Sequence, residues 1–272
     1  MTDKRYELAD LLRIMERLRD PEHGCPWDQA QDFKTIVPST LEECYELAAA
    51  IEAEDYSHLE DELGDVLFQV IFYAQLGAER SLFDFSSVVH VLCEKLLRRH
   101  PHVFADGLIE GIVDASIESA EVKTQWEAIK ASERQGKALH GVLDDVPVAL
   151  PALPRAQKLQ KRAARVGFDW SELPPVLAKL DEEIAELKAA VDAGNAASME
   201  DELGDVLFTT VNMARHLKVD AETALRRSSS KFEARFRAME SIAAGHGQSL
   251  SELNDEQLDA LWNAAKADQD ST

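Results

Sequence analysis

An eight-residue segment occurs twice, without a single change, in this chain of 272 residues. The first copy is Asp61–Phe68 and the second is Asp201–Phe208; both read Asp-Glu-Leu-Gly-Asp-Val-Leu-Phe. A second acidic cluster precedes each copy at the same spacing, formed by Glu42, Glu43 and Glu46 in one case and by Glu182, Glu183 and Glu186 in the other. Repetition at an interval of 140 residues predicts two homologous domains, each long enough to bury a core of its own.

Apolar residues recur at helical spacing through most of the chain, and no segment alternates with period two for long enough to indicate a strand. We therefore predict an all-α fold of two tandem helical bundles. The expected helices cover residues 4–19, 39–54, 57–77, 84–99 and 115–134, then a helix ending at 166, and finally 174–194, 197–217, 220–244 and 252–266. Capping-box patterns place two of the helix starts, at Ser39 or Thr40 and at Ser57, and Gly77 is the expected end of the second.

The helical periodicity lapses between Gly136 and Pro154, where three prolines accumulate. We place a linker at residues 141–154, between an N-terminal domain of residues 1–140 and a C-terminal domain of residues 155–272. The first copy carries four extra residues near Gly77, and beyond them the correspondence resumes. Lys95, Arg99 and Trp126 then align with Lys231, Arg235 and Trp262.

Acidic residues outnumber basic ones by 51 to 29, which gives a net charge of −22. This field repels nucleic acid polymers, but a few divalent cations and a local basic cluster can still hold a small anion such as a nucleotide. No apolar run is long enough to span a bilayer, and the N-terminal residues lack the core of a signal peptide. Cys25, Cys44 and Cys93 have no metal-ligand spacing, so we expect reduced thiols in the core of a cytoplasmic protein without membrane contact.

The acidic clusters have the spacing of metal ligands. Residues three apart share a helical face, so Glu43 projects with Glu46 and Glu62 projects with Asp65; two such helices side by side bring four carboxylates together. Desolvated carboxylates repel one another unless a cation neutralises them. Asp65 is flanked by apolar residues on a helix that we expect to be largely buried, which distinguishes it from solvated acidic surface.

The ligand chemistry favours a hard divalent cation. Ligation by oxygen alone fits Mg²⁺, with Mn²⁺ as a possible substitute, and leaves room for substrate phosphates. The Glu-x-x-His pairs of di-iron bundles and the Cys or His ligands of structural zinc sites do not occur at these positions.

Two basic pairs accompany the acidic clusters. Lys95 with Arg99, and Lys231 with Arg235, stand four residues apart, so each pair presents two cations on one helical face, where they can meet the phosphates of a metal-bound ligand. Trp126 and Trp262 either stack on a nucleotide base or fill the core, and the residues alone do not decide between these alternatives.

Together these motifs resemble the MazG family of nucleoside triphosphate pyrophosphohydrolases in its long, tandem form, over nearly the whole chain. The motif is E-E-x-x-E followed by E-x-x-D, and residues 24–28, 98–104, 166–170 and 231–236 support it. The resemblance implies an all-α fold shared with dimeric dUTPase-like enzymes, Mg²⁺ dependence and homodimerisation. It further implies hydrolysis of NTPs and dNTPs to monophosphates and pyrophosphate, with broad base tolerance and a role in cleansing the nucleotide pool.

The resemblance also implies roles for particular residues of the second copy. The metal ligands would be Glu183, Glu186, Glu202 and Asp205, which correspond to Glu43, Glu46, Glu62 and Asp65. The nucleotide would be contacted by Lys179, Leu180, Asp181, Glu182, Lys231, Phe232, Arg235 and Trp262, with Lys95, Arg99 and Trp126 in the corresponding places of the first copy. The C-terminal copy is the expected principal catalytic one. In the first copy Leu41 replaces Asp181, Leu96 replaces Phe232 and His100 replaces Phe236, and whether that copy is catalytic stays open.

Our hypothesis is that water attacks the α-phosphorus, with Glu183 holding the catalytic metal and Glu182 orienting or deprotonating the water. A regulatory module that binds nucleotides or proteins without turnover is the competing hypothesis, and a metal-free helical scaffold is a third. The sequence does not specify the preferred base or sugar, the number of metals per site or a protein partner. It also does not specify whether the two copies pair within one chain or across a dimer.

Overall fold

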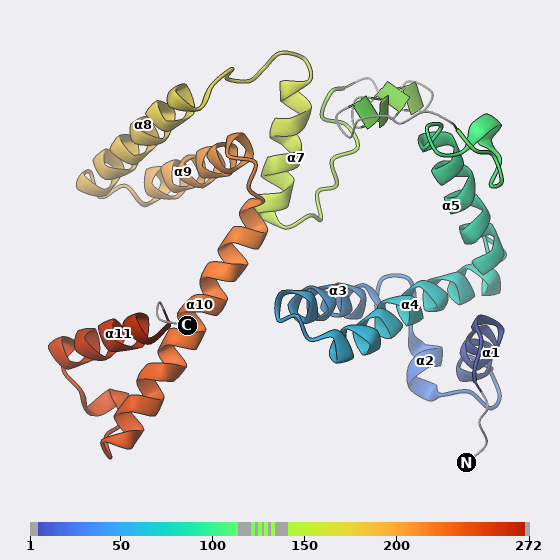
Figure 1. Cartoon of the computed structure of the whole chain (residues 1–272), viewed down its shortest axis with the longest axis horizontal. Helices are drawn as coiled ribbons and strands as arrows, with labels where there is room; N and C mark the ends of the chain where they lie inside the picture. The colour runs from blue at the N-terminus through green and yellow to red at the C-terminus, as the bar shows by residue number, and fades with distance from the viewer. Residues whose placement is uncertain are drawn as a thin grey trace. The chain divides into compact units, whose positions relative to one another are not determined.

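A computed structural model describes residues 5–113, 121–122, 125–126, 128–129, 132–133 and 141–269. Within these residues every regular element is helical, which confirms the predicted all-α fold (Figure 1). The chain divides into two compact units, Met1–Ser132 and Glu133–Thr272, and each is described by itself. In the described part of the chain, no helix is long and apolar enough to cross a membrane.

The first unit is built on a helical hairpin. Its elements are α1 (Leu8–Leu18), α2 (Pro26–Ala30), α3 (Val37–Glu52), α4 (Tyr56–Glu79), α5 (Phe85–Arg99) and a short 3₁₀ turn, η1 (Ala105–Gly107). Helices α3 and α4 lie side by side, and both α1 and α5 pack against α4. The described residues between 121 and 133 are also helical, in line with the predicted helix at 115–134; residues 114–120 lie outside the described part.

The core of this unit lies between α1, the start of α3 and the C-terminal half of α4. Five side chains are almost completely buried there: Met15, Ile36, Ile71, Phe72 and Leu76. Met15 comes from α1, Ile71, Phe72 and Leu76 come from α4, and Ile36 is the residue just before α3. The apolar faces of α1 and α4 therefore meet, as their helical periodicity predicts. Burial of an apolar side chain of this size stabilises a fold by about 1.5–3 kcal/mol.

The second unit repeats the hairpin and extends it. Its elements are α7 (Ala152–Ala164), α8 (Leu173–Asp192), α9 (Ala196–His216), α10 (Ala221–Gly245), η2 (Leu250–Glu252) and α11 (Asp255–Gln269). Helices α8 and α9 form the hairpin, and α7 packs against α9. Helix α10 contacts α7 and α9 and then pairs with α11 (Figure 1).

Several helix boundaries differ from those that the sequence predicts. Helix α3 begins at Val37, so Ser39 and Thr40 lie inside its first turns rather than capping it, because Pro38 is suited to the first turn of a helix. The N-cap of α4 is Asp55, whose side chain accepts from the backbone N–H of His58, and Ser57 therefore lies inside the helix. Gly77 does not end α4, which continues to Glu79.

The proline-containing segment before α7 packs onto the second unit. Val146 is buried, and Asp145 Oδ1 forms an ion pair with Arg162 Nη2 at 2.6 Å. Helix α7 begins at Ala152, just after Pro151. The linker at 141–154 and the domain boundaries on either side of it stay predictions.

Candidate metal centre and nucleotide site

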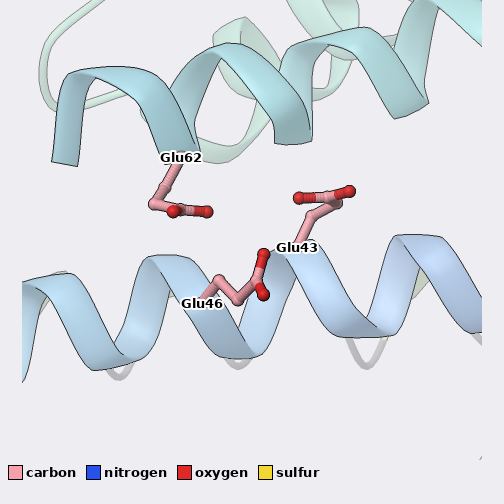
Figure 2. Close-up of side chains that lie close together, drawn as sticks. All are labelled: Glu43, Glu46 and Glu62. Carbon is pink, nitrogen blue, oxygen red and sulfur yellow. The ribbon is translucent and has the colours of Figure 1, made fainter. Parts of the chain in front are cut away.

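Three glutamates converge between the helices of the first hairpin. Glu43 and Glu46 project from α3 and Glu62 projects from α4 towards them (Figure 2). One carboxylate oxygen from each lies within 4.8 Å of the other two. Glu62 is only 6% exposed, so this carboxylate has given up most of its contact with water.

The second hairpin repeats this cluster. Glu183 and Glu186 come from α8 and Glu202 comes from α9, and their carboxylate oxygens also lie within 4.8 Å of one another. Here the buried member is Glu183, at 5% exposure. The spacing of three residues on one helix and a glutamate on its neighbour therefore places the carboxylates together in both units.

The fourth carboxylate of each motif lies at the edge of the cluster. Asp65 and Asp205 are exposed and do not belong to the groups of three carboxylates whose oxygens all lie within 4.8 Å of one another. Asp65 nevertheless interacts with the cluster: among the neighbouring charges, that of Asp65 has the largest effect in raising the pKa of Glu43, after burial. The expectation that the helix around Asp65 is largely buried was wrong: Leu63, two residues away, is 53% exposed. Helix α3 covers one side of α4 and leaves an apolar strip of it open in this chain.

The electrostatics of both clusters disfavour accumulated negative charge. Burial, followed by the charges of Asp65, Glu46 and Glu62, raises the pKa of Glu43. Desolvation, followed by its hydrogen bond and charge interaction with Glu183, raises the pKa of Glu186. A bound cation would relieve this repulsion.

The residues present fit a hard divalent cation. Every donor in the clusters is a carboxylate oxygen, the ligand type that Mg²⁺ and Mn²⁺ prefer. Glu62 Oε2 is buried and has no hydrogen-bond partner in the structure, so it is an acceptor without a donor. A cation between α3 and α4 would satisfy it.

The two clusters differ in the side chain that contacts the buried glutamate. In the first, His58 Nε2 lies 2.7 Å from Glu62 Oε1, one turn earlier on α4. In the second, Lys179 Nζ lies 2.8 Å from both Glu182 Oε1 and Glu183 Oε1, on α8. These contacts, first with Glu182 and then with Glu183, raise the pKa of Lys179. His58 was not among the residues predicted for the site, although its position four residues before Glu62 places the two side chains on the same face of the helix.

The predicted nucleotide-contacting stretch, residues 179–182, lies on α8 just before Glu183. Lys179 and Glu182 form the ion pair just described, Leu180 is half-buried, and Asp181 is exposed. The stretch therefore borders the carboxylate cluster directly, with Glu182 next to the buried Glu183.

The basic pairs and tryptophans lie together in each unit. On α10 the guanidinium of Arg235 stands 5.8 Å from the ring of Trp262, and Phe232 lies 5.4 Å from the same ring. In the first unit, Lys95 and Arg99 lie at the end of α5, and Trp126 lies 6.5 Å from His100, which follows that helix. In the second copy the tryptophan contacts the basic helix itself, and in the first it lies near the residue that follows that helix.

The second basic pair, Lys231 and Arg235, lies on α10. Lys231 is exposed and forms no ion pair with the glutamates of α8 and α9 in the described residues.

Two of the cysteines differ from expectation, because Cys44 and Cys93 are exposed on helix surfaces rather than buried in the core.

Comparison with known proteins places these features in a family. Residues 31–104 and 174–239 match the MazG nucleotide pyrophosphohydrolase domain, and each match spans one acidic hairpin. A nucleoside triphosphate pyrophosphohydrolase of Escherichia coli (strain K12) is 51% identical over 96% of this chain and 97% of its own length. A protein of Thermotoga maritima, named nucleoside triphosphate pyrophosphohydrolase/pyrophosphatase MazG, is 43% identical over 94% of each chain. The chain described here belongs to the MazG nucleotide pyrophosphohydrolase family.

Proposed function

We propose that this protein hydrolyses nucleoside and deoxynucleoside triphosphates to monophosphates and pyrophosphate, with broad base tolerance. The observation that carries the proposal is the carboxylate cluster between two helices, present twice, in a chain whose relatives are named for this activity. A nucleotide-pool cleansing role in the cytoplasm is the biological setting that fits such an activity.

The proposed metal ligands of the second unit are Glu183, Glu186, Glu202 and Asp205, for Mg²⁺ or for Mn²⁺ in its place. Bound divalent cations supply an activated water and offset the charge that develops on the phosphates. The other contributions come from the side chains around the cluster.

Glu182 is the proposed group that orients or deprotonates the attacking water. It is exposed beside the buried Glu183, and its only neighbouring cation on α8 is Lys179, at 2.8 Å. A carboxylate next to the ligand set, but not part of it, is suited to accept the proton as the water oxygen bonds to the α-phosphorus. The bond between the α-phosphorus and the bridging oxygen then breaks, and pyrophosphate leaves.

Lys231 and Arg235 are proposed to neutralise the triphosphate, with Phe232 and Trp262 beside them. Two cations one turn apart on one face of α10 can each form charge-assisted hydrogen bonds with oxygens of the triphosphate. Because Lys231 does not reach the glutamates within the described chain, conformational adjustment or a second subunit would bring the pair to the nucleotide.

A homodimer is the proposed assembly. Exposed apolar side chains follow the hairpin helices in both units: Leu63, Leu67 and Val70 on α4, and Leu203, Leu207 and Phe208 on α9. Apolar strips of this kind favour a second subunit over water.

The second unit is proposed as the principal catalytic one. The first unit retains its carboxylate cluster, Lys95, Arg99 and Trp126, but it carries Leu41 and Leu96 where the second has Asp181 and Phe232. It also has no counterpart of the ion pairs that Lys179 forms, because Ser39 stands at that position.

Product analysis tests the function directly. Wild-type protein, Glu43→Gln and Glu183→Gln are incubated with Mg²⁺ and a panel of NTPs and dNTPs, and pyrophosphate is separated from orthophosphate. We expect monophosphate and pyrophosphate from the wild type and from Glu43→Gln, and at least a 100-fold loss in Glu183→Gln, roughly the effect of removing a catalytic electrostatic group. Nucleotide binding without any turnover by the wild type would instead identify a regulatory module.

A further inference from the structure

The carboxylate cluster of the first unit has an imidazole beside it. His58 lies one turn before Glu62 on α4, and its Nε2 stands 2.7 Å from Glu62 Oε1. At the interval of 140 residues, the second unit has Ser198 in this place. The two clusters therefore share their carboxylates, but at this position the first has an aromatic nitrogen and the second has a hydroxyl.

Glu62 lacks a partner on the side of the cluster. Of the carboxylates in the described residues, Glu62 alone has a buried oxygen, Oε2, without a hydrogen-bond partner. Figure 2 shows this side chain pointing from α4 towards Glu43 and Glu46 on α3. A buried carboxylate oxygen that accepts from no donor is unfavourable, and other carboxylates nearby add repulsion. A cation between α3 and α4 removes both costs.

The pair of His58 and Glu62 differs from an ordinary surface pair of the same spacing. His90 and Glu94 on α5 are also four residues apart, but their side chains are both largely exposed and their nearest atoms are 3.6 Å apart. In the first cluster the imidazole of His58 is 62% exposed, whereas the side chain of Glu62 is 8% exposed. A solvent-exposed imidazole therefore contacts a carboxylate that is buried in the cluster.

The distance between these two side chains suits two ligands of one metal ion. Bonds of about 2.0–2.2 Å to zinc place neighbouring nitrogen and oxygen ligands about 3.0–3.4 Å apart. The 2.7 Å between His58 Nε2 and Glu62 Oε1 differs from this separation by a small side-chain adjustment. His58 is not one of the three converging residues, so it would complete the set as a fourth ligand from the solvent side. Asp65, the fourth carboxylate of the sequence motif, is exposed and also lies outside that group.

A nitrogen ligand changes which cation a site prefers. Imidazole suits zinc and the neighbouring transition metals, whereas Mg²⁺ takes oxygen ligands and retains several waters. Zinc accepts histidine nitrogen and carboxylate oxygen together and is usually four-coordinate. In the second cluster the nitrogen at the buried glutamate is the ammonium of Lys179, which has no lone pair to offer a metal. That cluster therefore keeps a set of oxygen ligands.

We infer that the first unit binds a transition-metal ion of the zinc class between α3 and α4, with His58, Glu43, Glu46 and Glu62 as its ligands. The two units of one chain then hold different cations, and the ion of the first unit joins the two helices of its hairpin. The inference goes beyond the proposed function, because no step of the hydrolysis in the second unit depends on it.

Zinc titration of the full chain tests the inference. Isothermal titration with Zn²⁺ is run without nucleotide, in Mg²⁺ sufficient to fill the second cluster. We expect one equivalent of bound Zn²⁺ in the wild type and an affinity at least about tenfold weaker in His58→Ser, which introduces the residue of the second unit. Mg²⁺ affinity, measured without zinc, should stay within about threefold, because Mg²⁺ does not need the nitrogen. No Zn²⁺ binding by the wild type, or equal Zn²⁺ affinity in His58→Ser, would overturn the inference.

Two control variants separate ligation by the imidazole from other effects. His90→Ser removes the histidine of the exposed pair on α5 and should leave Zn²⁺ affinity unchanged; a loss equal to that in His58→Ser would mean an adventitious ion only. His58→Gln retains a side chain that can donate a hydrogen bond to Glu62 but has no imidazole nitrogen, so its Zn²⁺ affinity should fall as in His58→Ser. Full affinity in His58→Gln would show that the hydrogen bond is sufficient and would exclude nitrogen ligation.

Nitrogen NMR of protein labelled with ¹⁵N-histidine gives a signature that is independent of affinity. One equivalent of Zn²⁺ should shift the ring-nitrogen resonances of a single histidine, and these resonances should be missing from the spectrum of His58→Ser. Shifts spread over several histidines, or no shift at all, would place the zinc elsewhere and would overturn the assignment. Denaturant unfolding of His58→Ser in the absence of metal checks that the fold is retained.

The reciprocal change rebuilds the first site in the second unit. Lys179→Ser combined with Ser198→His gives the second cluster both residues that the first has at these positions. We expect a second equivalent of Zn²⁺ in this double variant, and its absence would overturn the assignment of cation choice to His58.

All of these measurements are independent of turnover. Hydrolysis of NTPs by a wild type that binds no zinc would keep the proposed function and overturn this inference. Zinc bound through His58 in a protein that hydrolyses nothing would support the inference and remove the proposed function.

Discussion

The two acidic hairpins hold the corresponding three glutamates in the same arrangement, but a different side chain contacts the buried glutamate in each. In the first hairpin it is His58 of α4, which contacts Glu62, and in the second it is Lys179 of α8, which contacts Glu183. Serines stand at the corresponding positions of the other unit: Ser198 for His58 and Ser39 for Lys179. The carboxylate geometry is therefore a property of the hairpin, whereas the side chain that contacts it differs in type and in helix between the two units.

A second difference concerns the contact between each hairpin and the element before it. In the first unit Arg19, just after α1, donates to Glu79 at the end of α4, with both contacts at 2.7 Å. In the second unit the signs are exchanged, since Asp169 precedes the hairpin and Arg215 lies near the end of α9. Each unit therefore has an ion pair that links the segment before its hairpin to the second helix of the hairpin. In the first unit the side chains next to this ion pair form a packed core, whereas in the second unit a cavity lies there, lined by residues of α7, the loop of residues 167–170 and α9.

The largest expected difference between the copies is in turnover. Glu182→Gln should lower kcat by about 100-fold or more, the usual contribution of a general base, while Mg²⁺ and nucleotide affinity change little. Glu42→Gln, the matched change in the first copy, should leave most of the activity. Steady-state kinetics with a separate Mg²⁺ titration measures both. Equal losses in turnover, metal affinity and nucleotide affinity in Glu182→Gln would exclude its role as the base.

The exchange of Phe72 and Asn212, which stand at corresponding positions of α4 and α9, should have strongly unequal effects on stability. Phe72→Asn removes a fully buried ring and leaves an amide in an apolar core, which should cost about 4 kcal/mol of unfolding free energy. Asn212→Phe places a ring where a cavity already exists, and we expect a change below about 1 kcal/mol. Denaturant unfolding of the two variants checks the difference. Similar costs for both would show that the second unit is packed as tightly as the first.

The two ion pairs, Arg215 with Asp169 and Arg19 with Glu79, should contribute equally to the free energy of unfolding, and both contributions should change with pH in the same direction. Arg215 lowers the pKa of Asp169 below its ordinary 3.8, and Arg19 lowers that of Glu79 below its ordinary 4.5. Each carboxylate therefore binds a proton more readily in the unfolded chain than in the folded protein. The stabilisation from each ion pair is complete above the ordinary pKa of the carboxylate, and it is lost as the pH falls through the lower pKa of the folded state. Asp169→Asn and Glu79→Gln should each cost about 1–2 kcal/mol at pH 7, and much less near pH 3. A difference from wild type that stays constant down to pH 3 would contradict the ionic origin.

The sequence was sufficient to predict the helices and the meeting of the glutamates. Both follow from local rules: apolar periodicity forms the hairpin, and a spacing of three residues directs Glu183 and Glu186 to one face. Two predictions failed where a neighbouring element decides the outcome. Asp65 is exposed because α3 covers only one side of α4, and Ser39 does not cap α3 because Pro38 starts the helix earlier.

The cavity was beyond sequence reasoning for a different reason. Its buried amides come from separate helices, Gln160 from α7 and Asn212 from α9, and neither is polar in a pattern that indicates a pocket. The one local signal was the replacement of Phe72 by Asn212 within otherwise matching helices, and its meaning depends on what packs against that face.

The smallest expected effect concerns the lysine beside the second cluster, Lys179. Under the proposed metal binding, Lys179 would compete with the cation for Glu183. Lys179→Met should therefore lower the Mg²⁺ concentration at half-saturation by about threefold, measured by thermal shift without nucleotide. Ser39→Lys places a lysine at the corresponding position of the first unit, four residues before Glu43, and should weaken Mg²⁺ binding at Glu43 by a similar factor. The effects are small because partly exposed ion pairs are offset by hydration and by side-chain entropy. Shifts in the same direction for both variants would mean that the lysine acts on the fold rather than on the metal, and the difference between the copies would then lie in their interiors alone.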